Sequence, residues 1–344
     1  MVNVGIIGYG YAGRAFHSYL VPLSAGLHLE AIVSSSPEKR AQIERERGCR
    51  ALATVDELLS DPRIDLVVVA TPHDSHAELT IAALEAGKHV VTDKVMARTT
   101  AEADAMIAAA RRAGRMLSVF HNRRWDWDYQ TVRRVIEQGL LGRPYLYECA
   151  VMQNRLPRGW RRDPERSGSM LHDWGAHLID QALQLVSGSV VEVFCQVVRV
   201  SEEVAVGNLS KLVLRFDNGT LFEVLLANQA RWSKPRWFVL GDQGTLVKEG
   251  LDPQESAMVR GNIDAATEDP ALRARVRTTL GSLQAELVVD SVQSSWRSYY
   301  DNIAAHLNRG EPLAVTADSA RRVVAVLDAA MEAVRQGRSQ TVAI

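Results

Sequence analysis

The feature that most constrains this chain is a glycine cluster directly after a short apolar segment near the N-terminus. Residues 3–8 are mostly apolar and lead into the pattern GxGxxG, formed by Gly8, Gly10 and Gly13. In a βαβ unit the first glycine allows a tight turn, the second lets the backbone approach a pyrophosphate, and the third lets helix and strand pack closely. The free N–H groups of the next helix also attract phosphate. The cluster therefore predicts a dinucleotide-binding loop, with a purely structural glycine turn as the alternative.

The first 120 residues alternate between strand and helix patterns. Strands are expected near residues 3–8, 28–33, 66–71, 88–92 and 115–120, and helices near 11–20, 37–47, 75–86 and 100–113. The run 66–71, Leu-Val-Val-Val-Ala-Thr, lacks polar alternation, which is typical of a strand covered on both faces. Repeated strand–helix units of this length predict an α/β domain with a doubly wound parallel sheet.

After residue 120 the sequence is dominated by strand patterns. Strands are expected at 145–153, 190–200, 209–216 and 220–228, with a further pair around 241–244 and helices ending near 138 and 336. Asp217-Asn218-Gly219 is a hairpin signal, whereas residues 251–298 show weak periodicity. We therefore expect two domains: a Rossmann domain at 1–121, and an α+β domain at 122–344 with a large, open, mostly antiparallel sheet.

Composition and charge argue against several classes of protein. Lysine and arginine number 40 against 41 aspartates and glutamates, so a nucleic-acid or anionic-membrane binder is not expected. Cys49, Cys149 and Cys195 lie far apart without metal-binding spacing, as for buried cysteines in a reducing compartment. The sequence shows neither a basic leader nor an apolar stretch of the ~20 residues that span a bilayer. A cytoplasmic protein is expected.

The end of the second predicted strand bears on the choice of cofactor. An NAD enzyme usually carries an acidic residue there, about 20 residues after the glycines, for the ribose 2′-hydroxyl. This chain has Ser34, Ser35 and Ser36 instead, followed by Arg40. Hydroxyls and a cation suit a 2′-phosphate, so we expect NADP(H) to be preferred, with NAD(H) possible. Ser36 also fits the N-cap of the following helix, and one residue can do both.

Two further loops follow predicted strands, at the sheet edge where ligands bind in such folds. Their candidate side chains are Thr71, Pro72, His73, His76, Asp93 and Lys94. A lysine beside a nicotinamide can donate a hydrogen bond to a substrate hydroxyl and stabilise the developing alkoxide. A lone lysine is, however, more often a solvated surface residue.

Residues 168–181 resemble the start of a helix and carry a carboxylate and an imidazole on one face. Asp173 and His177 are four residues apart, and Asp180 follows three later. A carboxylate can orient an imidazole and raise its pKa, as general acid–base catalysis near neutral pH requires. Such a pair is also common as a structural hydrogen bond. No further His, Cys or Glu cluster completes a metal site, so no metal is expected.

Together these segments resemble the glucose–fructose oxidoreductase, inositol dehydrogenase and MocA-like (Gfo/Idh/MocA) oxidoreductase family over nearly the whole chain. The resemblance is carried by GYGYAG at 8–13, ATPHDSH at 70–76, GKHVVTDKV at 87–95 and DWGAH at 173–177. It implies that Lys94, Asp173 and His177 are catalytic, by their match to the family's Glu-Lys-Pro motif and Asp-x-x-x-His helix. Residues 122–126 and the serine-rich strand end resemble the branch containing NADP-dependent scyllo-inositol dehydrogenases.

The resemblance implies an NAD(P)-dependent dehydrogenase or reductase acting on the CH–OH group of a cyclic polyol or sugar. In that reaction His177 takes the hydroxyl proton, Asp173 orients His177, and Lys94 stabilises the alkoxide. Expected cofactor contacts are Gly8, Tyr9, Gly10, Tyr11, Ala12, Gly13, Ser34, Ser35, Ser36, Arg40, Thr71, Pro72, His73, His76, Asp93, Lys94 and Asn122. Candidate substrate contacts are Arg123, Trp125, Arg155, Trp160, Arg161 and Tyr300, with ordinary surface arginines as the alternative.

One departure from the family and several alternatives stay open. The family's Glu-Lys-Pro is Asp93-Lys94-Val95 here, so the peptide after Lys94 is either cis, as is common in the family, or trans with the lysine placed differently. The substrate is alternatively another ketosugar or anhydrosugar, and the abundant arginines permit a phosphorylated or carboxylated one. A non-catalytic NADP(H)-binding sensor is the other alternative. The open sheet predicts a homodimer or homotetramer.

Overall fold

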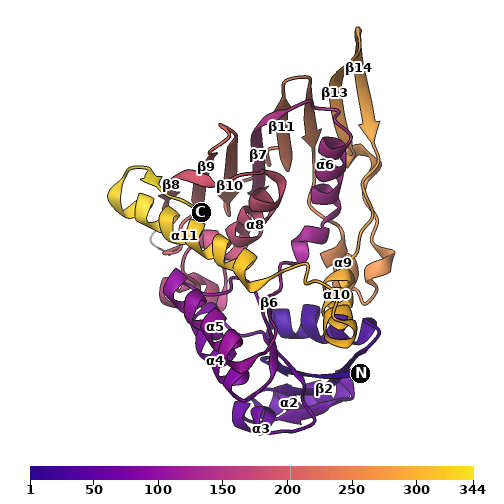
Figure 1. Ribbon diagram of the computed structural model, residues 1–344, viewed down its shortest axis with the longest axis vertical. Coiled ribbons are helices and arrows are strands. Elements are labelled where there is room, and N and C mark those ends of the chain that lie inside the picture. The colour runs from indigo at the N-terminus through magenta and orange to yellow at the C-terminus, as the bar shows by residue number, and fades with distance from the viewer. Residues whose placement is uncertain (202) are drawn as a thin grey trace. The chain divides into compact units, whose positions relative to one another are not determined.

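The computed structural model describes residues 1–201 and 203–344 and contains two compact units (Figure 1). The first unit consists of Met1–Asn122 and Trp296–Val324, and the second of Arg123–Ser295 and Ala325–Ile344. The boundary predicted after residue 121 lies beside the break between the first segments of the two units. Each unit also takes in a later segment of the chain, which the sequence did not indicate.

A six-stranded parallel sheet forms the centre of the first unit, in the order β3-β2-β1-β4-β5-β6. Its strands are β1 (Val2–Ile7), β2 (Leu27–Val33), β3 (Arg50–Leu52), β4 (Leu66–Val69), β5 (His89–Thr92) and β6 (Leu117–Val119). All four residues of β4 are buried, as expected for a strand covered on both faces. The predicted doubly wound sheet is confirmed.

Helices follow these strands, and side-chain N-caps begin three of those described. They are α1 (Ser18–Leu20), α2 (Pro37–Arg47), α3 (Val55–Leu59), α4 (His76–Glu85), α5 (Thr100–Ala113) and α10 (Arg297–Arg309), with short turns η1 (Gly13–His17), η2 (Val21–Leu23) and η3 (His73–Ser75). Lys39 N donates to Ser36 Oγ at the start of α2, so Ser36 is the N-cap. Thr99 caps α5 in the same way, and α10 packs against β1.

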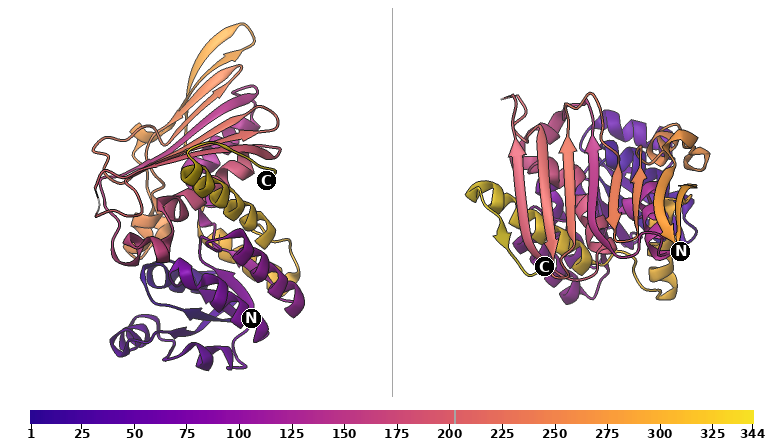
Figure 2. Two further views of the ribbon diagram at one scale, coloured as in Figure 1. Left: turned by 90° about the vertical axis from the view of Figure 1, so that its left-hand side faces the viewer. Right: turned by 90° about the horizontal axis from the view of Figure 1, so that it is seen from above.

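A nine-stranded sheet dominates the second unit, in the order β14-β13-β12-β11-β7-β10-β9-β8-β15 (Figure 2, right). Its strands are β7 (Pro144–Met152), β8 (Val190–Val198), β9 (Leu209–Phe216), β10 (Leu221–Ala227), β11 (Trp237–Gly241), β12 (Gly244–Lys248), β13 (Ala274–Leu280), β14 (Leu283–Val289) and β15 (Gln340–Thr341). Only the pairing of β7 with β10 is parallel among the described strands of this sheet. The large, mostly antiparallel sheet is therefore confirmed.

Helices cover one face of this sheet. The helices are α6 (Trp127–Glu137), α7 (Pro164–Ser167), α8 (Ala176–Leu185) and α9 (Gln254–Val259). The short turns are η4 (Asn122–Trp125), η5 (Gly159–Arg162), η6 (Leu171–Gly175), η7 (Ile263–Ala265) and η8 (Pro270–Leu272). A further helix, α11 (Ala317–Gln336), begins in the first unit and ends in the second. α8 packs on β10 and α6 on β12. Leu212, Leu214, Phe222 and Val224 alternate toward the buried face. Among the described residues, no helix is long and apolar enough to cross a membrane.

Candidate active site

The glycine loop joins β1 to η1 at the carboxyl end of the parallel strands. Gly8 has a φ of +103°, and a Cβ there would lie 2.6 Å from the Ala70 carbonyl oxygen. A Cβ on Gly13 would lie 2.1 Å from the Gly8 carbonyl oxygen, so only glycine lets η1 begin this close to the loop. A Cβ on Gly10, in contrast, meets nothing within 4 Å. Gly10 therefore presents bare, exposed backbone, which fits the close approach of a dinucleotide pyrophosphate.

The other members of the glycine loop differ in their surroundings. Tyr9 is buried, and its hydroxyl donates to Glu46 Oε2 at 2.8 Å. Tyr11 is exposed, and its ring packs edge-on against Phe16 with centroids 5.6 Å apart. Ala12 immediately precedes η1. Tyr9 thus fastens the loop to α2, while Tyr11 lies at the surface.

The carboxyl end of β2 brings a cation beside an exposed hydroxyl. Arg40 Nη1 donates to the carbonyl oxygens of Ser34 and Ser35, at 2.9 and 3.0 Å. Ser34 is buried and Ser35 is exposed. Ser36 caps α2 and also donates to Glu38 Oε2 at 2.6 Å, so its hydroxyl serves the helix. The groups suited to a 2′-phosphate are therefore Ser35 and Arg40.

His76 ties together the loops that follow β4 and β5. Its Nδ1 lies 2.7 Å from the Val95 carbonyl oxygen and its Nε2 lies 2.9 Å from the Thr71 carbonyl oxygen. The His73 ring lies 5.6 Å from the His76 ring, and Pro72 precedes the short turn η3. His76 is completely buried. These contacts give His76 the role of positioning both loops.

Lys94 follows β5, and the peptide bond between Lys94 and Val95 is cis. Asp93 Oδ1 accepts a hydrogen bond from the Lys94 main-chain N–H at 2.8 Å, and Asp93 Oδ2 lies 3.7 Å from His17 Nε2. His17 Nδ1 lies 2.6 Å from the Tyr300 hydroxyl. Burial acts to raise the pKa of Asp93, but the nearby His17 imidazole and the charge of Lys94 lower it to about 2. Asp93 is therefore an anion at neutral pH.

Tyr300, expected as a substrate contact, needs correction. It is completely buried on α10, with its hydroxyl on His17 and its ring 5.2 Å from that of Tyr299 and 5.8 Å from that of Phe120. Tyr300 belongs to the core of the first unit because α10 packs against β1 there. Asn122, the last residue in the first segment of this unit, is also buried.

In the second unit, Asp173 lies in η6 and His177 in the first turn of α8. Arg161 Nε lies 3.3 Å from Asp173 Oδ2, and the Arg161 guanidinium lies 4.7 Å from the centre of the Trp160 ring. The Trp174 ring lies 6.3 Å from that of His177. Two of the predicted substrate contacts, Trp160 and Arg161, therefore lie beside the predicted catalytic aspartate.

Arg123, a third predicted substrate contact, is occupied by other groups. Its guanidinium is buried, contacts Asp126 at 3.2 Å and Glu255 at 3.0 Å, and lies 4.3 Å above the Trp174 ring. Burial acts to lower the pKa of Arg123, but the neighbouring carboxylates outweigh it and raise the pKa. Arg123 therefore supports Trp174, which is a correction to its predicted role. The Trp125 carbonyl accepts hydrogen bonds from two side chains, so the main chain of this residue is also structural.

Buried polar contacts fix α8. Arg124 forms two hydrogen bonds to Asp180, at 2.6 and 2.8 Å. Gln181 Nε2 donates to the Arg123 carbonyl oxygen at 2.8 Å, and Arg236 Nη2 donates to Gln181 Oε1 at 3.1 Å. Within residues 1–201 and 203–344, no group of three or more His, Cys, Asp or Glu side chains is arranged to hold a metal ion.

Sequence reasoning missed His17 and its contact with Asp93. A polar residue on the otherwise apolar inner face of the predicted helix 11–20 was the available signal. Its partners are distant in sequence, and Tyr300 is 283 residues away. Local spacing therefore does not reveal this cluster.

The parallel sheet and the glycine loop define an oxidoreductase with an NAD-binding Rossmann domain joined to a second, sheet-based domain. The chain belongs to the Gfo/Idh/MocA family: residues 2–121 match the oxidoreductase family with an NAD-binding Rossmann fold, and residues 129–247 match the GFO/IDH/MocA C-terminal domain.

Several known proteins are similar over much of the chain. The scyllo-inositol 2-dehydrogenase (NADP(+)) IolW of Bacillus subtilis is 32% identical, covering 98% of this chain and 95% of IolW. The 1,5-anhydro-D-fructose reductase of Ensifer adhaerens is 28% identical, covering 73% of this chain and 77% of the reductase. The solved structure of the oxidoreductase yvaA from Bacillus subtilis has a TM-score of 0.93 at 30% identity, covering 99% of this chain and 98% of that one.

Proposed function

We propose that the protein is an NADP(H)-dependent oxidoreductase that interconverts a secondary alcohol and a ketone on a cyclic polyol or sugar. The observation that carries the proposal is the glycine loop, where Gly10 has open space and Gly13 has none. Lys94, Asp173 and His177 supply the groups that alcohol oxidation requires: a cation for the oxygen and a base for the proton. A relative that acts on an inositol and one that acts on an anhydrosugar support the substrate class.

The residues that would hold the cofactor belong to the first unit. The glycine loop would receive the pyrophosphate, and Ser35 with Arg40 would receive a 2′-phosphate, which favours NADP(H) over NAD(H). The loops fastened by His76 would flank the nicotinamide end, with Lys94 beside it and Asn122 as a further contact. The nicotinamide, when bound, accepts or donates the hydride.

The chain's own residues would handle the proton and the oxygen. In the oxidation direction His177 takes the hydroxyl proton as the carbon loses its hydride, and in reduction it returns that proton. The Lys94 ammonium of the first unit would supply a cationic donor that stabilises developing negative charge on an alkoxide oxygen. Asp173, whose Oδ2 lies 3.3 Å from Arg161 Nε, would orient His177 and neighbouring substrate hydroxyls.

The experiment that tests the function has two stages. First, NADPH and NADH are titrated into the purified protein and followed by the fluorescence of the reduced nicotinamide. Second, NADP+-dependent oxidation of an inositol and sugar panel is measured, together with NADPH-dependent reduction of the matching ketones. Preferred binding of NADPH with turnover on a polyol or sugar supports the proposal. Tight NADPH binding without turnover of any panel member contradicts the enzymatic part, and tighter NADH binding contradicts the role of Ser35 and Arg40.

We also propose a homodimer or homotetramer formed through the face of the nine-stranded sheet opposite α8. In the described part of the chain no helix covers that face (Figure 2, right). Its side chains include cross-strand ion pairs, Lys211 with Glu223 at 2.9 Å and Arg215 with Glu192 at 2.8 Å. Light scattering on the eluting protein gives the oligomeric mass, and a monomer at micromolar concentration contradicts this proposal.

A further inference from the structure

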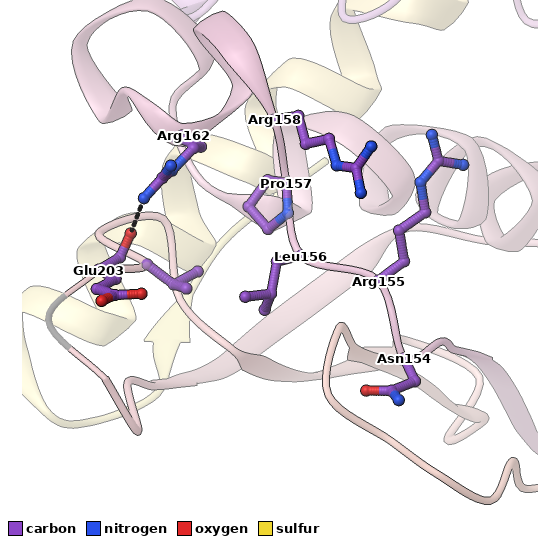
Figure 3. A pocket seen from close by; sticks show the side chains of 8 residues that line it. Asn154, Arg155, Leu156, Pro157, Arg158, Arg162 and Glu203 are labelled. Carbon is purple, nitrogen blue, oxygen red and sulfur yellow. Dashed lines mark hydrogen bonds between the residues drawn. The ribbon is translucent and has the colours of Figure 1, made fainter.

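A pocket in the second unit is built from one arginine-rich segment and the start of a neighbouring loop. Its cavity has a volume of about 380 Å³, within the range of roughly 300–1,000 Å³ that is usual for small-molecule sites. The lining residues are Asn154, Arg155, Leu156, Pro157, Arg158, Arg162, Glu203 and Val204 (Figure 3). Three of these eight residues are arginines.

The segment concentrates positive charge that the chain as a whole lacks. Residues 154–166 contain five arginines but only two acidic residues, Asp163 and Glu165, whereas the whole chain has a net charge of −1. A local excess of this kind attracts an anion. A site for a neutral ligand usually offers both hydrogen-bond donors and acceptors. This segment instead offers mostly cationic donors.

Two of the arginines have no partner among the residues that the structure describes. Across residues 1–201 and 203–344, the guanidiniums of Arg155 and Arg158 make no hydrogen bond or ion pair. Figure 3 shows both side chains extending on the same side of the segment, while Arg162 and Glu203 lie on the other side. Arg162 donates to the main-chain carbonyl of Glu203 at 3.2 Å. Arg155 and Arg158 thus line the same pocket, and their guanidinium donors are not used by the described residues.

Three other arginines of the same unit are paired with carboxylates. Arg161 pairs with Asp173, Arg124 with Asp180, and Arg236 with Asp128. The arginines that stabilise the fold of this unit therefore have carboxylate partners. An arginine fork matches the two oxygens of a carboxylate or phosphate, and two adjacent guanidiniums can each donate two hydrogen bonds to one such group.

The two segments that line the pocket are joined to η6, the turn that holds Asp173. Arg161 follows Arg158 by three residues, and its Nε lies 3.3 Å from Asp173 Oδ2. On the other wall, Val204 is two residues from Val206, whose carbonyl oxygen accepts from Met170 N at 3.3 Å, directly before η6. Both walls are thus joined to η6, the turn that holds Asp173.

We propose that Arg155 and Arg158 bind the carboxylate or phosphate group of the substrate, so that the substrate is an anionic sugar or polyol derivative. This inference rests on the proposed function and narrows its substrate class. The reaction is unchanged: the anionic group anchors the substrate while a ring hydroxyl elsewhere on the molecule is oxidised.

The test compares matched neutral and anionic substrates. Turnover of glucose, glucuronate and glucose 6-phosphate is measured, followed by the carboxylated and phosphorylated forms of any inositol or sugar that is turned over. We expect kcat/KM for an anionic member to exceed that of its neutral counterpart at least tenfold. The double variant Arg155→Gln/Arg158→Gln should lower kcat/KM about 10- to 100-fold for the anionic member and by a clearly smaller factor for the neutral one. Comparison of the carboxylate with the phosphate identifies which group is bound.

Arg260→Gln is the matched control, because Arg260 is an exposed arginine of the same unit that does not line the pocket. Thermal unfolding confirms that all variants fold. The inference is overturned, while the proposed function stands, in either of two cases. In the first, kcat/KM for the anionic members does not exceed that for the neutral ones. In the second, the double variant lowers kcat/KM equally for both. If no compound is turned over, calorimetric titration with glucuronate and inorganic phosphate decides. Binding that the double variant loses and Arg260→Gln retains supports the inference, and no binding to the wild-type protein overturns it.

Discussion

Two alanine substitutions in the glycine loop should separate folding from cofactor binding. A Cβ on Gly13 would lie 2.1 Å from the Gly8 carbonyl oxygen, which belongs to the main chain and has no side-chain freedom to move aside. The two segments must then separate by about 1 Å, and overpacking of this kind costs about 3 kcal/mol. A first unit of this size should lose about 6 to 12 °C of its melting temperature.

Gly10→Ala is the matched variant in the same loop. Gly10 does not have a positive φ, and its Cβ would have no neighbour within 4 Å, so alanine is accommodated without strain. We expect the free energy of unfolding to change by less than about 0.5 kcal/mol. The methyl group would instead occupy space that a pyrophosphate needs, and a loss of about 1.4 kcal/mol or more in binding raises the Kd for NADPH at least tenfold.

The assay combines thermal unfolding of the cofactor-free variants with NADPH fluorescence titration. Gly13→Ala should have a lower melting temperature than the wild type. Gly10→Ala should have the melting temperature of the wild type but bind NADPH more weakly. The reasoning is refuted if Gly10→Ala binds NADPH as tightly as the wild type, because the open space at Gly10 would then not be the pyrophosphate position. It is also refuted if Gly13→Ala melts with the wild type.

Three further predictions concern the remaining site residues. His177→Ala should lower kcat about 100- to 10,000-fold with an unchanged Kd for NADPH, and near wild-type turnover would remove His177 from the proton transfer. Ser35→Asp should weaken NADPH binding and strengthen NADH binding, because a carboxylate repels a 2′-phosphate and accepts from a 2′-hydroxyl; an unchanged ratio of the two Kd values would argue against this position. Asp93 has a pKa of about 2 in the folded protein against a usual 3.8, so it contributes about 2 kcal/mol of stability above pH 4 that is lost as the pH falls through 2. In urea unfolding at pH 7, Asp93→Asn should therefore be about 2 kcal/mol less stable than the wild type, and the difference should be smaller near pH 3. Equal stability of the two proteins at both pH values would contradict the pairing of Asp93 with His17.

The sequence allowed prediction where a pattern is local. The glycine spacing predicted a loop that the structure places between β1 and η1, and the unbroken apolar run at 66–71 predicted the buried strand β4. Strands β13 and β14 were missed. In β14 no residue is fully buried, and β13 alternates buried residues with exposed arginines, so neither has the strong apolar pattern of a central strand.

The candidate site was less predictable because its contacts join distant segments. The spacing of four between Asp173 and His177 predicts that they share one helix face, and the structure places Asp173 in η6 and His177 in α8, which follows it directly. The contact of His17 with Tyr300 spans 283 residues, and nothing in either local sequence indicates it. Arg123 and Tyr300 were chosen as polar or aromatic residues suited to a pocket. The structure places one against two carboxylates and the other in the core.

The buried contacts of α8 explain how the second unit holds the helix that carries His177. Asp180 and Gln181 lie about one turn beyond His177, and they bind Arg124 and the Arg123 carbonyl respectively. A buried ion pair adds little stability over apolar packing, but loss of one partner costs about 3–5 kcal/mol because a charge is left unpaired. The pair of Arg124 with Asp180 therefore disfavours any rotation or slip of α8 that would separate the two groups. Because Asp180 and His177 share this helix, the pair of Arg124 with Asp180 also holds the part of α8 from which the His177 side chain extends.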